Sequence, residues 1–229
     1  MTKLLTLVPV AAALVLAACQ ETTSPAPSNS LAVRPAFAVG GGNSGLTLHP
    51  GGLGEQSFAK WVSHEGEPDS KGNADQALYF QKMVATPVVA AGFAVIEGLE
   101  GQLVSDLTKL SWDHRDGGWC GAGAPRWDVF VTGSSGTPYT LFLGCAAADH
   151  TPASEPGWIT DSYAGAAIVT VGGGNAGLTA AQQADAAAGT ITGLSIVFDE
   201  GTDVGPGFVF LDNITVNGMV WTKPADNSN

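Results

Sequence analysis

Six short runs of aromatic and β-branched residues constrain the fold of this chain more than any other feature. Each run is bounded by glycine, proline, serine or aspartate, which favour turns, whereas the runs themselves favour strands. The runs are Ala77–Ala85, Lys109–Arg115, Arg126–Gly133, Tyr139–Gly144, Gly193–Glu200 and Gly207–Gly218, and two weaker ones are Phe93–Gly101 and Trp158–Ala164. Short strands at this spacing predict an all-β fold, an antiparallel β-sandwich of the jelly-roll type.

Alternation within two runs predicts which side chains share a face, because successive side chains of a strand point to opposite sides. The positions that share a face by this period are Trp127, Val129 and Val131 in one run and Phe208, Phe210, Ile214 and Val216 in another. Asp212 falls among the second set, so the period places one carboxyl group with four apolar side chains.

The segment Leu178–Gly189 departs from the strand pattern. Thr179 is a candidate N-cap, Gly189 is a stop signal, and the positions between are rich in alanine and glutamine. We therefore expect one short helix inserted between strands.

An uninterrupted apolar run, Leu4–Ala18, follows Lys3 near the N-terminus. It is shorter than a membrane-spanning helix, which needs about 20 residues, and a short basic start followed by an apolar run is typical of a secretory signal. The run ends in LAAC, which resembles the bacterial lipobox, and that resemblance implies a lipidated Cys19. The alternative is an ordinary signal peptide with a chance cysteine.

These features divide the chain into a signal peptide at 1–18, a Pro/Ser/Gly-rich tether at 19–45, a β-sandwich domain at 46–222 and a flexible tail at 223–229. A lipid on Cys19 would anchor the protein to a membrane without spanning it. Gln20 follows the cysteine. In the Gram-negative lipoproteins that this motif resembles, a residue other than aspartate there implies the outer membrane or cell surface.

The chain is acidic, with a formal net charge of −12. Cleavage after residue 18 removes Lys3, the one charged residue of the signal, and takes the charge from −12 to −13. Nucleic acid is excluded as a partner because its phosphates need a basic face. The charge is compatible with cations or neutral glycans, and we expect a monomer.

Cys120 and Cys145 remain as a pair once Cys19 is assigned to lipid. In an exported protein, an even pair indicates a disulfide. It would close a loop of about 25 residues, which stabilises the fold by about 3.5 kcal/mol in the chain-entropy model. A metal–thiolate site is not expected, because no third and fourth ligand lie at suitable spacing. The histidines are scattered, at His49, His64, His114 and His150.

Three stretches in order, WCGAGAPRWDV, LFLGC and IVFDEGTDVGPGFVFLDNITVNG, resemble a group of uncharacterised secreted bacterial β-sandwich domains. The overall pattern is similar to the galactose-binding-like jelly rolls that include many carbohydrate-binding modules. The resemblance covers roughly Ala77 to Gly218. It implies a Cys120–Cys145 disulfide and no proven catalytic residue, and it places Asp212 near a structural calcium.

Four acidic residues near the C-terminus, Asp199, Glu200, Asp203 and Asp212, are candidate calcium ligands, since calcium takes carboxylate oxygens. The alternative is a hairpin with solvated acids, in which Asp212 accepts hydrogen bonds from neighbouring backbone, because the glycines and Pro206 suit a turn. A buried Asp212 could instead pair with Arg126.

Exposed tryptophans stack on sugar rings, whereas buried ones fill the core of a β-sandwich. Among the six tryptophans, Trp119 lies in a glycine-rich loop and is the first candidate for an exposed ring. Trp61 and Trp158 are the next candidates.

The leading interpretation is a lipid-anchored, non-catalytic binding module of the cell envelope, with carbohydrate as its ligand class. One alternative is an enzyme that acts on polysaccharide, but Glu97 and Glu100 fall on opposite faces of a strand and make no catalytic pair. The other is a purely structural or adhesive envelope protein.

Overall fold

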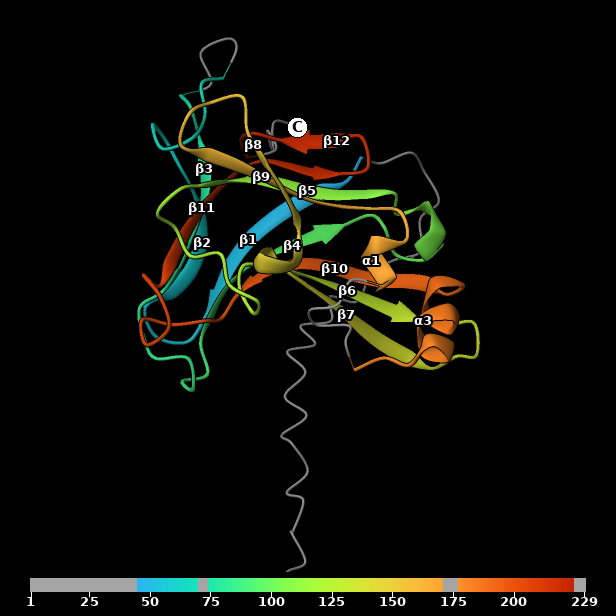
Figure 1. Cartoon of the computed structure of the whole chain (residues 1–229). Helices are drawn as coiled ribbons and strands as arrows, with labels where there is room; N and C mark the ends of the chain where they lie inside the picture. Colours follow the sequence, from blue (N-terminus) through green and yellow to red (C-terminus); the bar gives the residue numbers. More distant parts are fainter. Residues whose placement is uncertain (1–44, 70–73, 171–176, 225–229) are drawn as a thin grey trace, which may run out of the picture. The chain divides into compact units, whose positions relative to one another are not determined.

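A computed structural model gives the structure of the chain and describes residues 45–69, 74–170 and 177–224 (Figure 1). These residues belong to one compact unit, Asn43–Asn229. The predicted signal peptide, Cys19, the predicted tether up to residue 44 and residues 225–229 of the predicted tail lie outside the described residues. Within the described ranges, no helix has the length and apolar character needed to cross a membrane.

The strands form two antiparallel sheets. The five-stranded sheet has the order β1 (Thr47–Leu53), β4 (Ala91–Glu97), β10 (Thr190–Phe198), β6 (Arg126–Thr132) and β7 (Pro138–Gly144). The seven-stranded sheet has the order β2 (Ser57–Val62), β3 (Ala77–Lys82), β11 (Phe208–Val216), β5 (Lys109–Arg115), β9 (Trp158–Ala164) and β8 (Asp149–Pro152), with β12 (Met219–Trp221) paired to β11. This arrangement confirms the predicted all-β sandwich.

One hydrophobic core lies between the sheets. Trp112 of β5 stacks on Trp127 of β6 with ring centroids 5.0 Å apart, so the two sheets meet through these rings. Trp127, Val129 and Val131 are buried while Phe130 between them is 38% exposed, which confirms the alternation expected for this run.

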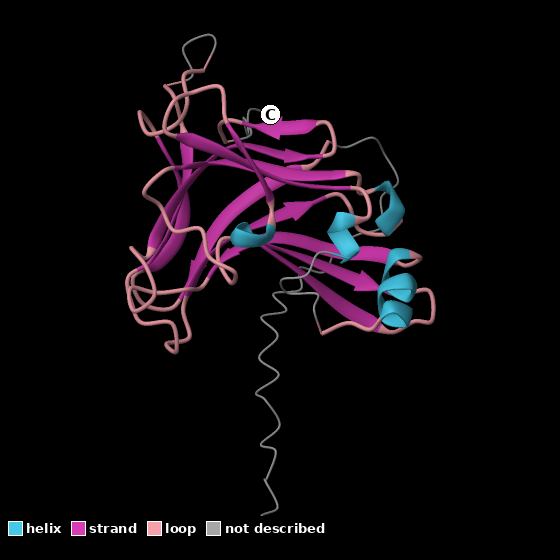
Figure 2. Cartoon of the chain, in the orientation of Figure 1, coloured by secondary structure: helices cyan, strands magenta, loops and turns pink. Residues whose placement is uncertain are grey.

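Within the described ranges, two short helices rather than the one expected accompany the sheets, and they are drawn in cyan in Figure 2. Helix α3 (Ala180–Ala187) begins after Thr179, whose side chain and that of Gln182 form a capping box. Helix α1 (Ala167–Thr170) was missed because it is a single turn that contains β-branched residues. Burial of Ile168 and Val169 outweighs that local preference. The described residues also form two 3₁₀ turns, Val104–Asp106 and Cys145–Ala147.

A β-bulge in β11 overturns the expected face of that strand. The register against β5 shifts between Asp212 and Thr215, and Asn213 has a φ of 46°. A bulge reverses the alternation beyond it. Ile214 and Val216 therefore point into the core, whereas Phe208 and Phe210 are only partly buried and lie on the outer face of the sheet.

Candidate functional site

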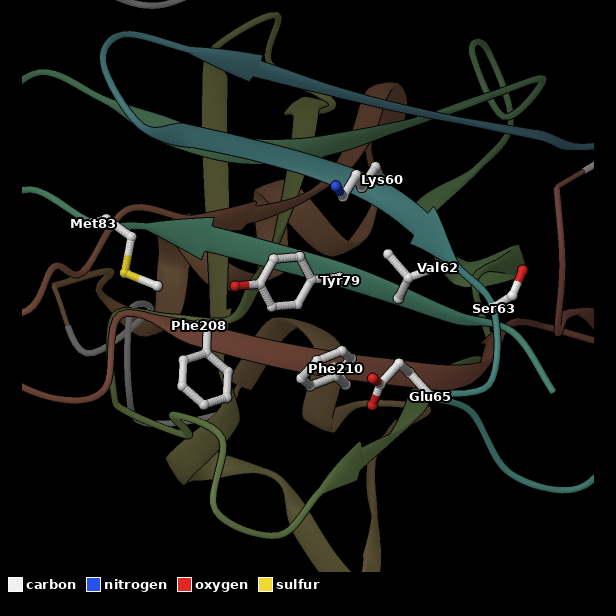
Figure 3. Close-up of a pocket in the computed structure, with 8 residues that line it drawn as sticks. All are labelled: Lys60, Val62, Ser63, Glu65, Tyr79, Met83, Phe208 and Phe210. Atoms are coloured by element: carbon white, nitrogen blue, oxygen red, sulfur yellow. The ribbon is translucent and has the colours of Figure 1, made fainter.

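A shallow groove of about 420 Å³ crosses the outer face of β2, β3 and β11. Figure 3 shows its side chains standing on one side of these three strands. The residues that line it are Lys60, Val62, Ser63, Glu65, Tyr79, Met83, Phe208 and Phe210. Alternation explains the placement, because the neighbours Ala59, Phe80 and Val209 point into the core.

Four aromatic side chains gather on this face, and we call Phe58, Tyr79, Phe208 and Phe210 the outer aromatic cluster. The Tyr79 and Phe210 ring centroids are 4.7 Å apart, and Tyr79 lies 6.0 Å from Phe58. Phe208 lies 6.0 Å from Phe210. All four rings are half-buried, so each keeps part of its surface accessible to a ligand.

Charged side chains flank the aromatic rings. The Arg115 guanidinium lies 3.7 Å from the Phe210 ring centroid and donates to a Glu65 carboxylate oxygen at 2.5 Å. At the other side, Lys60 Nζ lies 4.9 Å from the Phe58 centroid. One lysine and one glutamate line the groove itself, so the charges of its lining side chains balance and favour neither an anionic nor a cationic ligand.

Tyr79 adds a hydrogen-bonding group at the centre of the groove. Its hydroxyl donates to Gln81 Oε1 at 3.1 Å. Burial raises the pKa of Tyr79 above its ordinary value, so the phenol stays protonated at neutral pH. The site thus combines flat apolar rings with polar groups, the arrangement typical of small-ligand sites.

Three buried carboxyl groups, on Glu67, Asp113 and Asp212, lie next to this groove along β5, β11 and the chain after β2. Asp212 Oδ2 accepts from the Glu67 backbone N–H at 2.8 Å, and Oδ1 accepts from the Asn213 N–H at 2.7 Å. Asp113 accepts from the Thr160 hydroxyl and, at 2.8 Å, from the Asn213 side chain.

These carboxyl groups have no lysine or arginine ion-pair partner among the described residues. Burial raises the pKa of Glu67 to about 8. A hydrogen bond with Asp113 and the negative charge of Asp113 act in the same direction. Burial also raises the pKa of Asp212 to about 7. The cluster therefore holds protons near neutral pH.

The structure does not bring the four candidate calcium ligands together. Asp199 pairs with Arg126 at 2.6 Å, Glu200 accepts from the Trp119 indole N–H, and Asp203 accepts from the Thr86 N–H at 2.7 Å. Asp212 bonds to backbone N–H groups, as the hairpin alternative expected. A calcium ion at Asp212 itself stays a prediction.

The suggested pairing of Asp212 with Arg126 is wrong. Arg126 bonds instead to Asp128, at 2.7 Å, and to Asp199. Asp128 is two residues away on the same face of β6, and Asp199 follows the adjacent strand β10, so both carboxylates are nearer than the one on the other sheet.

The three candidate tryptophans pack rather than present open rings. Trp158 is 7% exposed, and Trp61 and Trp119 are half-buried against the core. Trp119 is partly covered because Gly205, in the segment between β10 and β11, lies against its ring. A Cβ at Gly205 would come within 2.2 Å of a ring atom of Trp119. Trp158 is therefore closed to a sugar ring, whereas stacking on the accessible parts of Trp61 and Trp119 stays a prediction.

The expected disulfide is present. Cys120 and Cys145 are bonded, with Cα atoms 5.1 Å apart. The bond ties the loop between β5 and β6 to the end of β7.

Comparison with known proteins gives only distant similarities. No protein-family model matches the sequence, and no curated protein matches it. Among solved structures, the chain is similar to the family 11 carbohydrate-binding module of the cellulosomal cellulase Lic26A-Cel5E of Clostridium thermocellum. The identity is 13% and the TM-score 0.40, over 77% of this chain and 91% of that one.

A family 11 module from Clostridium thermocellum in complex with a β-1,3-1,4-mixed-linked tetrasaccharide gives 13% identity and a TM-score of 0.39, over 77% of this chain and 91% of that one. A β-1,2-glucanase from Parabacteroides distasonis gives 13% identity and a TM-score of 0.36, over 76% of this chain and 23% of that one. Similarities this distant place no binding site, so the candidate site rests on this chain's own side chains.

Proposed function

We propose that this protein is a non-catalytic carbohydrate-binding module, and that its ligand stacks on the outer aromatic cluster. The observation that carries the proposal is the gathering of Phe58, Tyr79, Phe208 and Phe210 on the solvent side of β2, β3 and β11. Aromatic rings in a sandwich normally enter the core. Four on an outer face, beside a groove, indicate a binding surface.

The chemistry of the groove favours a neutral sugar chain. A pyranose ring has apolar faces formed by its C–H groups and a polar rim of hydroxyls. The rings of the cluster suit those faces, and Lys60, Ser63 and Glu65 supply donors and acceptors along the groove. An open groove also admits a chain that continues beyond the sugars it contacts.

A binding role fits the groove better than glycoside hydrolysis. Hydrolysis needs two carboxyl groups about 5 to 10 Å apart on either side of the bond that is cut. Among the described residues, Glu65 is the one carboxylate that lines the groove, and Arg115 holds it in an ion pair. The neighbouring Glu67 is 6% exposed and so is out of reach of a substrate.

Affinity electrophoresis through gels that contain one polysaccharide each tests the proposal. The panel includes β-1,3-1,4-linked glucan, β-1,4-linked glucan, xylan, mannan and pectin. We expect at least one polysaccharide to retard the protein, and Phe210→Ala to weaken that binding by about 1 to 3 kcal/mol. Phe130→Ala is the matched control, because Phe130 is an exposed phenylalanine of the other sheet. Equal retardation of both variants would overturn the proposal.

We further propose that the module is held at the outer membrane or cell surface by a lipid on Cys19. The support is the LAAC motif at the end of the apolar run Leu4–Ala18. The Pro/Ser/Gly-rich residues between Cys19 and the sandwich would then act as a tether between membrane and module.

A further inference from the structure

A second polar cluster lies on the inner side of β5 and β9, on the face opposite the outer aromatic cluster. At its centre, the Asp161 carboxylate has no exposed surface. One oxygen, Oδ2, accepts from Trp112 Nε1 at 2.7 Å and lies 2.6 Å from His114 Nδ1. The other oxygen lies 2.7 Å from His150 Nδ1.

The disulfide lies against this cluster. Cys145 Sγ is 3.1 Å from Asp161 Oδ2. A disulfide sulfur carries no proton, so this contact places the sulfur next to the carboxylate without a hydrogen bond. One ligand atom each from His114, Cys120, Cys145 and Asp161 lies within 4.8 Å of the other three. Three of these side chains are buried, and Cys120 is half-buried at the edge.

We infer that reduction of the Cys120–Cys145 disulfide opens a four-ligand site for Zn²⁺ or a similar thiophilic divalent cation. Two thiolates, an imidazole and a carboxylate are ligands that zinc takes in proteins. Zinc–ligand bonds of 2.0–2.3 Å set tetrahedral ligand–ligand distances of roughly 3.3 to 3.8 Å. The most widely separated ligand atoms therefore need to draw together by about 1.5 Å at most, whereas the two sulfurs move apart to this spacing once the bond between them is broken.

The chemistry balances with a dithiol as reductant. The dithiol gives two electrons and two protons, the S–S bond of the protein breaks, and a disulfide forms in the reductant. Cys120 and Cys145 are then thiols, and Zn²⁺ displaces both thiol protons to solvent. His114 binds through the ring nitrogen that carries no proton.

The bound cation would close the same loop that the disulfide closes, because the same two sulfurs hold it. The segment between Cys120 and Cys145 would thus stay attached in both redox states. His150 also has a part, since its Nδ1 orients Asp161 from the side away from the sulfurs, and such outer contacts support metal ligands.

Spacing in the sequence conceals this site. His114 comes from β5 and Asp161 from β9, and neither lies at the short intervals from the cysteines that mark a zinc motif. The third and fourth ligands come together because the two strands pair: Asp161 stands opposite Trp112, and His114 lies two residues beyond Trp112 on β5.

Cobalt titration of the full chain tests the inference. The protein carries Cys19→Ser, so that Cys120 and Cys145 are its only thiols, and it is reduced with a phosphine without oxygen. We expect one Co²⁺ per chain, with thiolate-to-cobalt charge-transfer absorption and tetrahedral d–d bands, both displaced by Zn²⁺. The oxidised protein should show neither. The dissociation constant should rise by about 10- to 100-fold in His150→Gln and should not change in His64→Gln.

Two controls keep the test decisive if reduction loosens the fold. The Cys120→Ser/Cys145→Ser variant also lacks the disulfide but offers no thiolate, so Zn²⁺ should raise the melting temperature of the reduced protein and not of this variant. If the reduced chain loses its near-ultraviolet circular dichroism, Zn²⁺ should restore it. Cobalt spectra without charge transfer, equal Zn²⁺ effects in both proteins, or binding without recovery of the native spectrum would each overturn the inference.

Discussion

Asn213 has a φ of 46°, in the left-handed region that residues other than glycine, asparagine and aspartate rarely adopt. Its side chain donates to Asp113 at 2.8 Å, which fixes this conformation against β5. The bulge that results turns Phe208 and Phe210 outward. A strict period of two does not show a bulge, so the sequence predicted that these rings share a face with Ile214 and Val216, and the candidate groove was not predicted.

At this position we expect Asn213→Val to destabilise the protein by about 1 to 3 kcal/mol, because a β-branched residue is strained at positive φ. Asn213→Gly keeps the conformation and loses only the side-chain hydrogen bond, so it should cost less. Urea denaturation measures both free energies of unfolding. A valine variant as stable as the glycine variant would contradict this role for the backbone.

The residues of the buried carboxyl cluster predict an unusual pH dependence. The pKa values of Glu67, about 8, and Asp212, about 7, lie above those of free side chains. Between about pH 5 and pH 8 the folded protein therefore retains protons that the unfolded chain releases, and stability falls as pH rises. We expect a higher melting temperature at pH 5 than at pH 8. The difference should be about 2 to 4 °C for each kcal/mol by which the free energy of unfolding falls between the two pH values.

Melting curves recorded at several pH values measure this dependence. EGTA is present so that no divalent cation binds the carboxylates when they lose their protons. Glu67→Gln removes one titrating group, so its melting temperature should change less between pH 5 and pH 8. Stability that rises over this interval, or an unchanged slope in Glu67→Gln, would show that the cluster does not hold its protons.

At the scale of elements, the sequence placed several strands accurately. Lys109–Arg115 matches β5 to the residue, and the weaker candidate Trp158–Ala164 matches β9 to the residue. Strand β1 was missed since it contains Pro50, Gly51 and Gly52. Proline is tolerated there because β1 is an edge strand. A Cβ at Gly52 would come within 2.4 Å of the Ser57 carbonyl, so β1 and β2 can approach only without a side chain.

A single lysine connects two of these elements. Lys82, at the end of β3, is 1% exposed and donates to the carbonyls of Thr86, Val88 and Asp199 at 2.7–2.9 Å. It joins the loop after β3 to the end of β10. We expect Lys82→Met to lower the free energy of unfolding by about 2 to 4 kcal/mol, because three carbonyls lose their donor.

Lys60→Met is the matched control, since Lys60 is an exposed lysine on the neighbouring strand β2. Its effect on stability should stay within about 0.5 kcal/mol. Chemical denaturation of both variants compares them, and similar losses would mean that the Lys82 contacts do not hold the loop.

For the whole molecule, the sequence predicted the sandwich and the disulfide, because local patterns and cysteine number report them directly. It did not predict the groove or the four-ligand cluster, because both arise from side chains that meet only after strands pair.

Membrane attachment is a property of the whole chain that the folded part does not report. Cys19→Ser should move the protein from the membrane fraction to the soluble fraction, and immunoblotting of the two fractions measures this. Unchanged partitioning would contradict lipid attachment.

The central claim is that sugar binds the outer face of β2, β3 and β11. Amide NMR spectra of the ¹⁵N-labelled protein, titrated with oligosaccharides from each polysaccharide of the panel, test it most directly. We predict that one oligosaccharide series shifts amides clustered in Ser57–Val62, Ala77–Lys82 and Phe208–Asp212, while amides around Phe130 stay unchanged. Shifts gathered instead on β6 and β7, or in the loop around Trp119, would contradict the proposed site.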